Sequence, residues 1–214
     1  MRGLMLFAGA GLVALGAVIF VVILTSKHSG KATDASVASA MKAAGCTYQD
    51  VTITIPKGQG THIPTLETKV KWLTYPPAGG QHYGQWAVWN FYRDPVAPKM
   101  VVHNEEHGGV ILWWGQNVPS SEIDKINAFY TSSPNSMLGT PAAPVDGKSL
   151  GSKVAITAWT GDPSKYGRNG YHGFGHVAVC PTFDEGAFKK FRDAYRGKGP
   201  EGIPTSANNP GEGP

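Results

Sequence analysis

The chain has 214 residues, of which 41% are hydrophobic and only 16% are charged. This composition excludes a disordered, highly charged chain and a coiled coil, because globular domains already carry about 25% charged residues. The 28 Gly and 16 Pro favour a loop-rich domain over a helical bundle. The net charge of +4, without a long basic run, does not indicate nucleic-acid binding.

The amino terminus is the most apolar part of the sequence. Residues 3–25 contain no charged side chain, and a helix needs about 20 apolar residues to cross the hydrocarbon core. Residues 1–25 are therefore predicted to be a transmembrane anchor. The nearest small-x-small cleavage site, Ala38-Ser39-Ala40, is distant from the apolar run, which favours an uncleaved anchor over a removed signal peptide. The positive charges before and after the span are nearly equal in number, so they do not fix which side of the membrane the domain occupies. We expect a single-pass protein of the cell membrane with its domain outside the cytoplasm.

The elements after the span are predicted from periodicity and turn residues. Residues 26–44 are expected to be a polar stalk and a short helix, and residues 45–196 one soluble domain. Strands are predicted over 48–55, 66–74, 85–92, 153–159 and 175–180. Residues 100–114 are expected to begin and end as strand.

Two helices have clearer boundaries. One is predicted to start at Ser120-Ser121 and to end before Pro134, and another to start near Thr182. The Gly/Pro-rich residues 197–214 are predicted to be a disordered tail. The predicted fold class is α+β, with one mixed or antiparallel sheet and helices packed on one face.

The densest group of titratable residues is His-Asn-Glu-Glu-His at 103–107, between two apolar runs. Placing these groups inside an apolar segment costs stability unless they are paired or bound. His103 and His107 can reach one point from a helical turn, whereas on a strand they lie roughly 13 Å apart. A shared ion therefore requires a turn. The zinc-protease motif does not match, because Asn104 follows the first His.

Two further histidines lie in predicted loops, and imidazole suits zinc, copper, iron and nickel. The sequence predicts a copper or zinc site, with copper slightly favoured because the site is rich in His and lies outside the cytoplasm. Glu106 is expected to be a ligand or to orient an imidazole. His176 is a weaker candidate, and His172 is expected on a loop surface. The alternative is that each histidine is a hydrogen-bonded structural residue. The predicted metal ligands are His62, His82, His103, His107 and Glu106.

Cys46 and Cys180 are the two cysteines of the chain. In an exported domain they are expected to form a disulfide, which would contribute about 4–5 kcal/mol by closing a large loop. Separate thiols and a copper-binding thiolate pair are the alternatives. The sequence has no Cys-x-x-Cys, nucleophile elbow, phosphate loop or dinucleotide fingerprint.

The segments Pro76-Pro77-Ala78-Gly79-Gly80-Gln81-His82 and His103-Asn104-Glu105-Glu106-His107-Gly108 resemble the core of an uncharacterised bacterial family. This family is a domain of unknown function common in actinobacteria, with single-span anchored members and the pattern Pro-Pro-Thr-Ser-Gly-x-His, then His-x-x-Glu-His-Gly. The resemblance covers about residues 45–195 and implies that the five predicted ligands lie at family positions. The chain departs from the pattern at Ala78-Gly79 and at Glu105. The family has no assigned activity.

Three functions follow as hypotheses. The first is a membrane-anchored, extracytoplasmic metal-binding protein in metal handling or redox chemistry. The second is a metal-dependent enzyme with an open coordination position, in which Glu105 or Glu106 activates water. The third is a metal-free cell-envelope interaction module. The membrane is the partner that the sequence predicts; nucleic acid is not expected, and the sequence indicates no particular protein partner.

Overall fold

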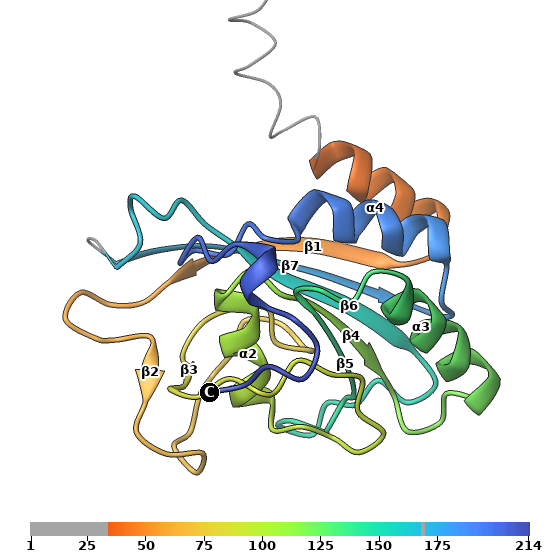
Figure 1. Ribbon diagram of the computed structural model, residues 1–214, viewed down its shortest axis with the longest axis horizontal. Coiled ribbons are helices and arrows are strands. Elements are labelled where there is room, and N and C mark those ends of the chain that lie inside the picture. The colour runs from red at the N-terminus through yellow and green to blue at the C-terminus, as the bar shows by residue number, and fades with distance from the viewer. Residues whose placement is uncertain (1–33, 168–169) are drawn as a thin grey trace, which may run out of the picture. The chain divides into compact units, whose positions relative to one another are not determined.

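The computed structural model describes residues 34–167 and 170–214 (Figure 1). The predicted membrane span at 1–25 and the residues up to 33 lie outside the described residues. Within the described ranges, no helix is both long and apolar enough to cross a membrane. Residues 37–214 form one compact unit.

A five-stranded mixed sheet forms the centre of this unit. Its strand order is β1-β7-β6-β4-β5, and only the β4–β5 pair is parallel. The central strands β4 and β6 are buried almost throughout, which explains their continuous apolar sequences. The strands are β1 (Thr47–Thr54), β4 (Val110–Trp114), β5 (Met137–Pro141), β6 (Val154–Thr160) and β7 (Tyr171–Cys180).

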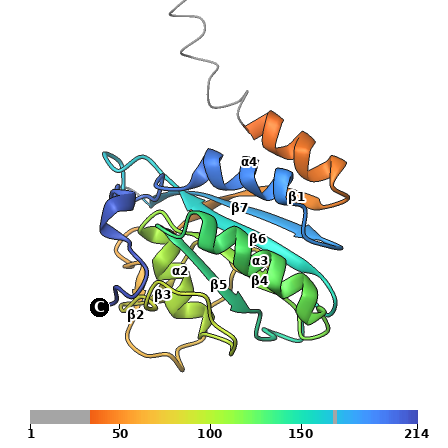
Figure 2. The ribbon, with the colours of Figure 1, turned by 45° about the vertical axis from the view of Figure 1, so that its right-hand side comes forward.

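One face of the sheet is covered by α3 (Ser120–Ser132), α4 (Glu185–Tyr195) and part of a helix over residues 34–43 (Figure 2). Alternate strand residues such as Leu112 and Ile156 meet Phe129 and Phe188 in the main core. Asp184 caps α4 by accepting a 2.8 Å hydrogen bond from the Ala187 N–H. A disulfide joins Cys46 to Cys180 and so links the ends of β1 and β7.

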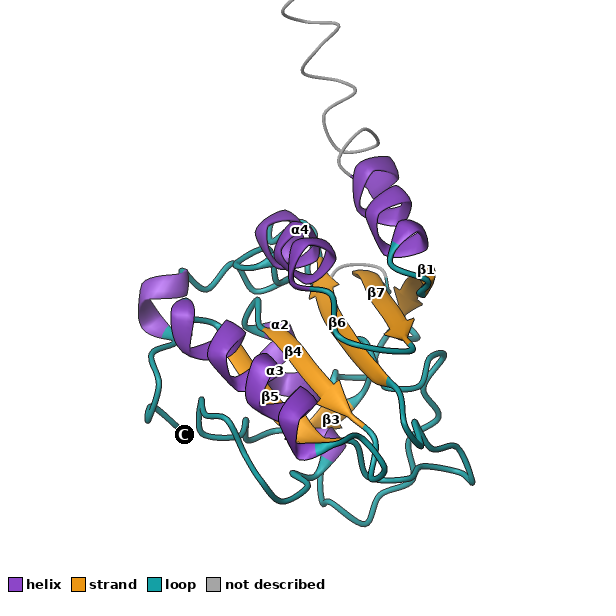
Figure 3. Ribbon diagram, turned by 90° about the vertical axis from the view of Figure 1, so that its right-hand side faces the viewer, coloured by secondary structure: helices purple, strands orange, loops and turns teal. Residues whose placement is uncertain are grey.

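Helix α2 (Pro98–Glu106) packs on the opposite face, behind β4 in Figure 3. The predictions of helices on one face only and of a strand starting at residue 100 are therefore wrong. Pro98 favours a helix start, and Gly108, at φ +86°, follows the helix end in the left-handed region. Val101 packs against Ile111 and Trp113 of the sheet, which stabilises the helix.

Loops cover the outer side of α2. The predicted strands over 66–74 and 85–92 are loops, apart from one bridge of Phe91 with Gly139. The Asn104 side chain accepts from the Ala87 N–H and donates to the Ala87 carbonyl, both at 2.9 Å. In a strand, the backbone groups of Ala87 would pair with a neighbouring strand. In this loop they pair with a side chain of α2 instead.

The carboxyl-terminal segment, residues 197–214, also packs against this region, so the prediction of a disordered tail is wrong. The Gly197 N–H donates to the Gly108 carbonyl at 2.8 Å, and the Trp89 N–H donates to the Glu212 carbonyl at 2.8 Å. Asn208, 2% exposed, follows the short 3-10 helix η1 (Thr205–Ala207). Its hydrogen bonds hold a segment whose Gly and Pro content alone indicates disorder.

Candidate metal centre

Two very short strands place the first pair of histidines. β2 (His62–Ile63) and β3 (His82–Tyr83) run parallel, with His62 directly opposite His82. Neighbours in register project to the same face of a sheet, and the two imidazole centroids lie 5.0 Å apart. His82 is fully buried, whereas the His62 side chain is 48% exposed.

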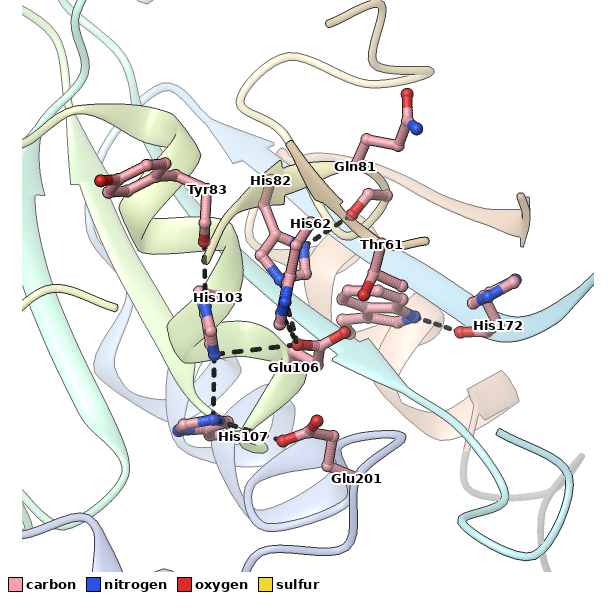
Figure 4. A network of polar contacts seen from close by, with 12 residues as sticks. Thr61, His62, Gln81, His82, Tyr83, His103, Glu106, His107, His172 and Glu201 are labelled. Atoms are coloured by element: carbon pink, nitrogen blue, oxygen red, sulfur yellow. Dashed lines mark hydrogen bonds and ion pairs between the residues drawn. The ribbon is translucent and has the colours of Figure 1, made fainter. Parts of the chain in front are cut away.

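Helix α2 supplies the other two members of the cluster. His103 and Glu106 are three residues apart and so share a helix face. The Nε2 atoms of His62, His82 and His103 lie 3.4, 3.0 and 3.9 Å from Glu106 Oε2 (Figure 4). One ligand atom from each of these four residues lies within 4.8 Å of every other. Three chain segments therefore converge on one carboxylate oxygen.

The outward-facing nitrogens fix the protonation of two imidazoles. His82 Nδ1 lies 2.8 Å from the Gly80 carbonyl oxygen, and His103 Nδ1 lies 2.9 Å from the Tyr83 carbonyl oxygen. A carbonyl only accepts, so both Nδ1 atoms carry the proton. In the neutral ring the inward Nε2 is then a bare lone pair. A hydrogen bond from His82 Nε2 to Glu106 requires an additional proton on the ring.

The electrostatics of the cluster favour an ionised Glu106. Burial raises the pKa of this carboxyl, but the hydrogen bond and charge of His82, together with Tyr166, outweigh burial and lower the pKa to about 2. The Tyr166 hydroxyl donates to Oε1 and leaves Oε2 facing the imidazoles. Burial lowers the pKa of His103 to about 4, so its ring is neutral near pH 7.

These four ligand atoms fit a single small cation. A tetrahedral ion with bonds of about 2.1 Å separates its ligands by about 3.4 Å, and the separations from Oε2 bracket that value. In the described part of the chain, every ion-pair partner of Glu106 is a histidine. The carboxylate charge is therefore directed at the centre of the imidazole cluster.

His107, the fifth predicted ligand, lies beside this group and outside it. Its Nε2 is 3.1 Å from His103 Nε2 and 3.3 Å from Glu201 Oε2. The Trp86 ring packs against the His107 ring at 4.7 Å. Glu201 belongs to the segment that was predicted to be disordered, so its role at the edge of the cluster was missed.

A family model described as "Protein of unknown function (DUF3105)" matches residues 63–207, about two thirds of the chain. The chain belongs to the DUF3105 family. The DUF3105 match contains His82, His103, Glu106 and His107, and it begins one residue after His62. Neither the search of curated proteins nor the search of solved structures found a significant match.

Glu105 of this DUF3105 chain is bound elsewhere and does not join the cluster. It is fully buried, with Oε2 accepting from the Gly79 N–H at 2.8 Å and Oε1 accepting from the Thr157 hydroxyl at 2.5 Å. Burial raises its pKa to about 8. Both oxygens hold the loop and the sheet together, which leaves Glu106 as the carboxylate of the site.

The two remaining histidines of the DUF3105 domain lie apart from the cluster. His172 is 4% exposed, and its Nδ1 accepts from the Ile55 N–H at 3.2 Å, so its prediction as a surface loop residue is wrong. His176 pairs with Asp50 at 2.6 Å in the sheet. Tyr166, 60 positions from Glu106, was missed because no local motif connects the two.

Proposed function

We propose that this DUF3105 protein binds one transition-metal ion, copper or zinc, through His62, His82, His103 and Glu106. The observation that carries the proposal is the convergence of three Nε2 atoms on Glu106 Oε2, with two of the rings oriented by Nδ1–H bonds to carbonyls. Lone pairs facing a carboxylate inside a protein repel one another unless a cation lies between them.

A metal ion satisfies these atoms better than protons do. A proton on His82 Nε2 stabilises only one contact, the 3.0 Å hydrogen bond to Glu106. The lowered pKa of His103 opposes a second proton near pH 7. One ion accepts a lone pair from all four residues, and the Nδ1–H bonds already orient two of the rings. Metal binding is therefore favoured over a purely structural network.

The make-up of the ligand set supports metal handling more than hydrolysis. Four protein ligands complete a tetrahedral shell and leave no position for a reactive water. Three of the ligands are buried, while the 48% exposed His62 provides the route by which an ion enters and leaves.

We further propose that the domain works outside the cytoplasm, anchored by the apolar residues 3–25. The length of that segment supports a membrane span. The Cys46–Cys180 disulfide supports an oxidising compartment, because such bonds persist mainly there.

Elemental analysis of the full-length protein tests the proposed metal. The protein is purified in a mild detergent without a His tag or chelator, incubated separately with copper and zinc, and desalted. We expect about one equivalent of bound metal in the wild type, a loss in His82→Gln, and retention in His107→Gln, whose residue lies outside the four-residue group.

Circular dichroism confirms that both variants are folded. If the folded wild type binds neither metal, the proposal is wrong. If His107→Gln loses the ion and His82→Gln keeps it, the ion is held by a different set of residues.

A further inference from the structure

A second chain of polar contacts crosses three strands of the sheet, away from the metal cluster. Asp50 of β1 is the register partner of His176 of β7, which in turn pairs with Ala158 of β6. Thr160 lies two residues beyond Ala158 on β6 and so projects to the same face. A hydroxyl, an imidazole and a carboxylate are thereby aligned across the sheet.

The distances within this row of polar contacts are those of strong hydrogen bonds. His176 Nδ1 lies 2.6 Å from Asp50 Oδ1, and His176 Nε2 lies 2.7 Å from Thr160 Oγ1. The Tyr48 hydroxyl also donates to Asp50 Oδ1, at 2.5 Å. Tyr195 stacks on the His176 ring with centroids 3.9 Å apart, which fixes the ring plane.

Asp50 determines the direction of these bonds. An ionised carboxylate only accepts, so His176 Nδ1 is the protonated nitrogen and Nε2 of the neutral ring is the acceptor. The Thr160 hydroxyl therefore donates to His176 Nε2. This polarity matches that of a hydroxyl nucleophile, a general base and an orienting carboxylate.

Thr160 also lines a cavity of about 470 Å³. The walls include Pro163, Phe174 and Lys198, together with the glycines at 197, 199 and 202. Phe174 and His176 are two apart on β7 and share a face, so the buried base lies behind Thr160 while the Phe174 ring forms part of the cavity wall. The volume suits a small organic group, with apolar surface for an acyl chain and, in Asp162 and Lys198, one charge of each sign on the wall.

We propose that Thr160, His176 and Asp50 form a hydrolytic site for small carboxylic esters. Thr160 Oγ bonds to the ester carbonyl carbon while its proton passes to His176 Nε2. The bond from that carbon to the alcohol oxygen then breaks, and the leaving alcohol takes the proton. Water attacks the acyl-threonine, giving its proton to His176, and restores the Thr160 hydroxyl as the carboxylic acid leaves. Asp50 is a positioning residue that holds the imidazole.

The test uses the full-length protein with p-nitrophenyl acetate as the probe. We expect release of p-nitrophenolate above the spontaneous rate, and a trapped acetyl group on the peptide that contains Thr160. Thr160→Val, which keeps the side-chain shape, should reduce the rate by about 10²-fold or more, while Thr160→Ser retains activity. Thr131→Val, at an exposed threonine of α3, should leave the rate unchanged.

A wild type that hydrolyses the ester no faster than buffer and carries no acetyl group overturns the proposal. Equal rates in the wild type and Thr160→Val also overturn it, and the hydrogen-bonded chain is then structural. If Thr160→Val does not fold, the site of acetylation in the wild type and in Thr160→Ser decides the outcome.

Discussion

Removal of the Cys46–Cys180 disulfide should destabilise the domain strongly, because the two cysteines are 134 positions apart. Closing a loop of this length lowers the entropy of the unfolded chain by an amount equivalent to about 5 kcal/mol at 25 °C. The loop spans most of the domain, from the start of β1 to the end of β7. Since whole domains are stable by about 5–15 kcal/mol, the double variant Cys46→Ala/Cys180→Ala should be only marginally folded.

Urea unfolding followed by tryptophan fluorescence measures this effect. With a slope of about 2 kcal/mol per molar urea, the midpoint should fall by about 2.5 M. The wild type treated with a reductant should show the same fall, which controls for packing changes caused by the alanines. Equal midpoints for the oxidised wild type and the double variant would refute the loop-closure argument.

Three further predictions concern the elements around the site. Burial lowers the pKa of His103 to about 4 in the folded protein, so on acidification the unfolded chain binds the extra proton first. The free energy of unfolding of the metal-free protein should therefore fall by about 3 kcal/mol between pH 6.5 and pH 4. Urea unfolding at each pH measures this change, and a flat profile would contradict it. Gly79→Ala should cost about 2–5 kcal/mol in the same assay, because φ is +84° and the new methyl would lie 2.8 Å from a buried indole ring. Gly58→Ala, at φ +83° with no atom within 4 Å, is the matched control and should cost about 1 kcal/mol; equal costs would show that the close contact does not matter. Asn208→Ala should cost about 1–3 kcal/mol because it removes a buried hydrogen bond to Ser136 and a partly buried one to the His107 carbonyl. Faster proteolysis of the carboxyl-terminal segment should accompany the loss, and unchanged protease resistance would show that this side chain does not hold the segment.

The sequence predicted those elements whose side chains alternate or repeat against a single core. The strand over 48–55 corresponds to β1 and was predicted from its β-branched residues, and the helix after Thr182 corresponds to α4, whose apolar residues repeat along one buried side. Helix α2 was missed because six of its nine residues are buried. A helix buried on all sides has no polar stripe, so Val101-Val102 is typical of a strand.

Residues at the site were easier to predict than their arrangement. Local spacing and loop residues indicated His62, His82, His103 and Glu106, which the structure brings together. The contacts that decide which predicted ligands join the group connect residues far apart in the sequence. His107 pairs with Glu201 outside the group. The β2–β3 pairing places His62 opposite His82, although no sequence motif connects these two histidines.

The proposed metal centre can be located in crystals of the full-length protein grown with zinc, with anomalous diffraction recorded at the zinc edge. We predict one anomalous peak about 2.1 Å from a nitrogen of His62, His82 and His103 and from an oxygen of Glu106. A crystal without a peak at this position, or with its only peak between His107 and Glu201, would contradict the proposed metal centre.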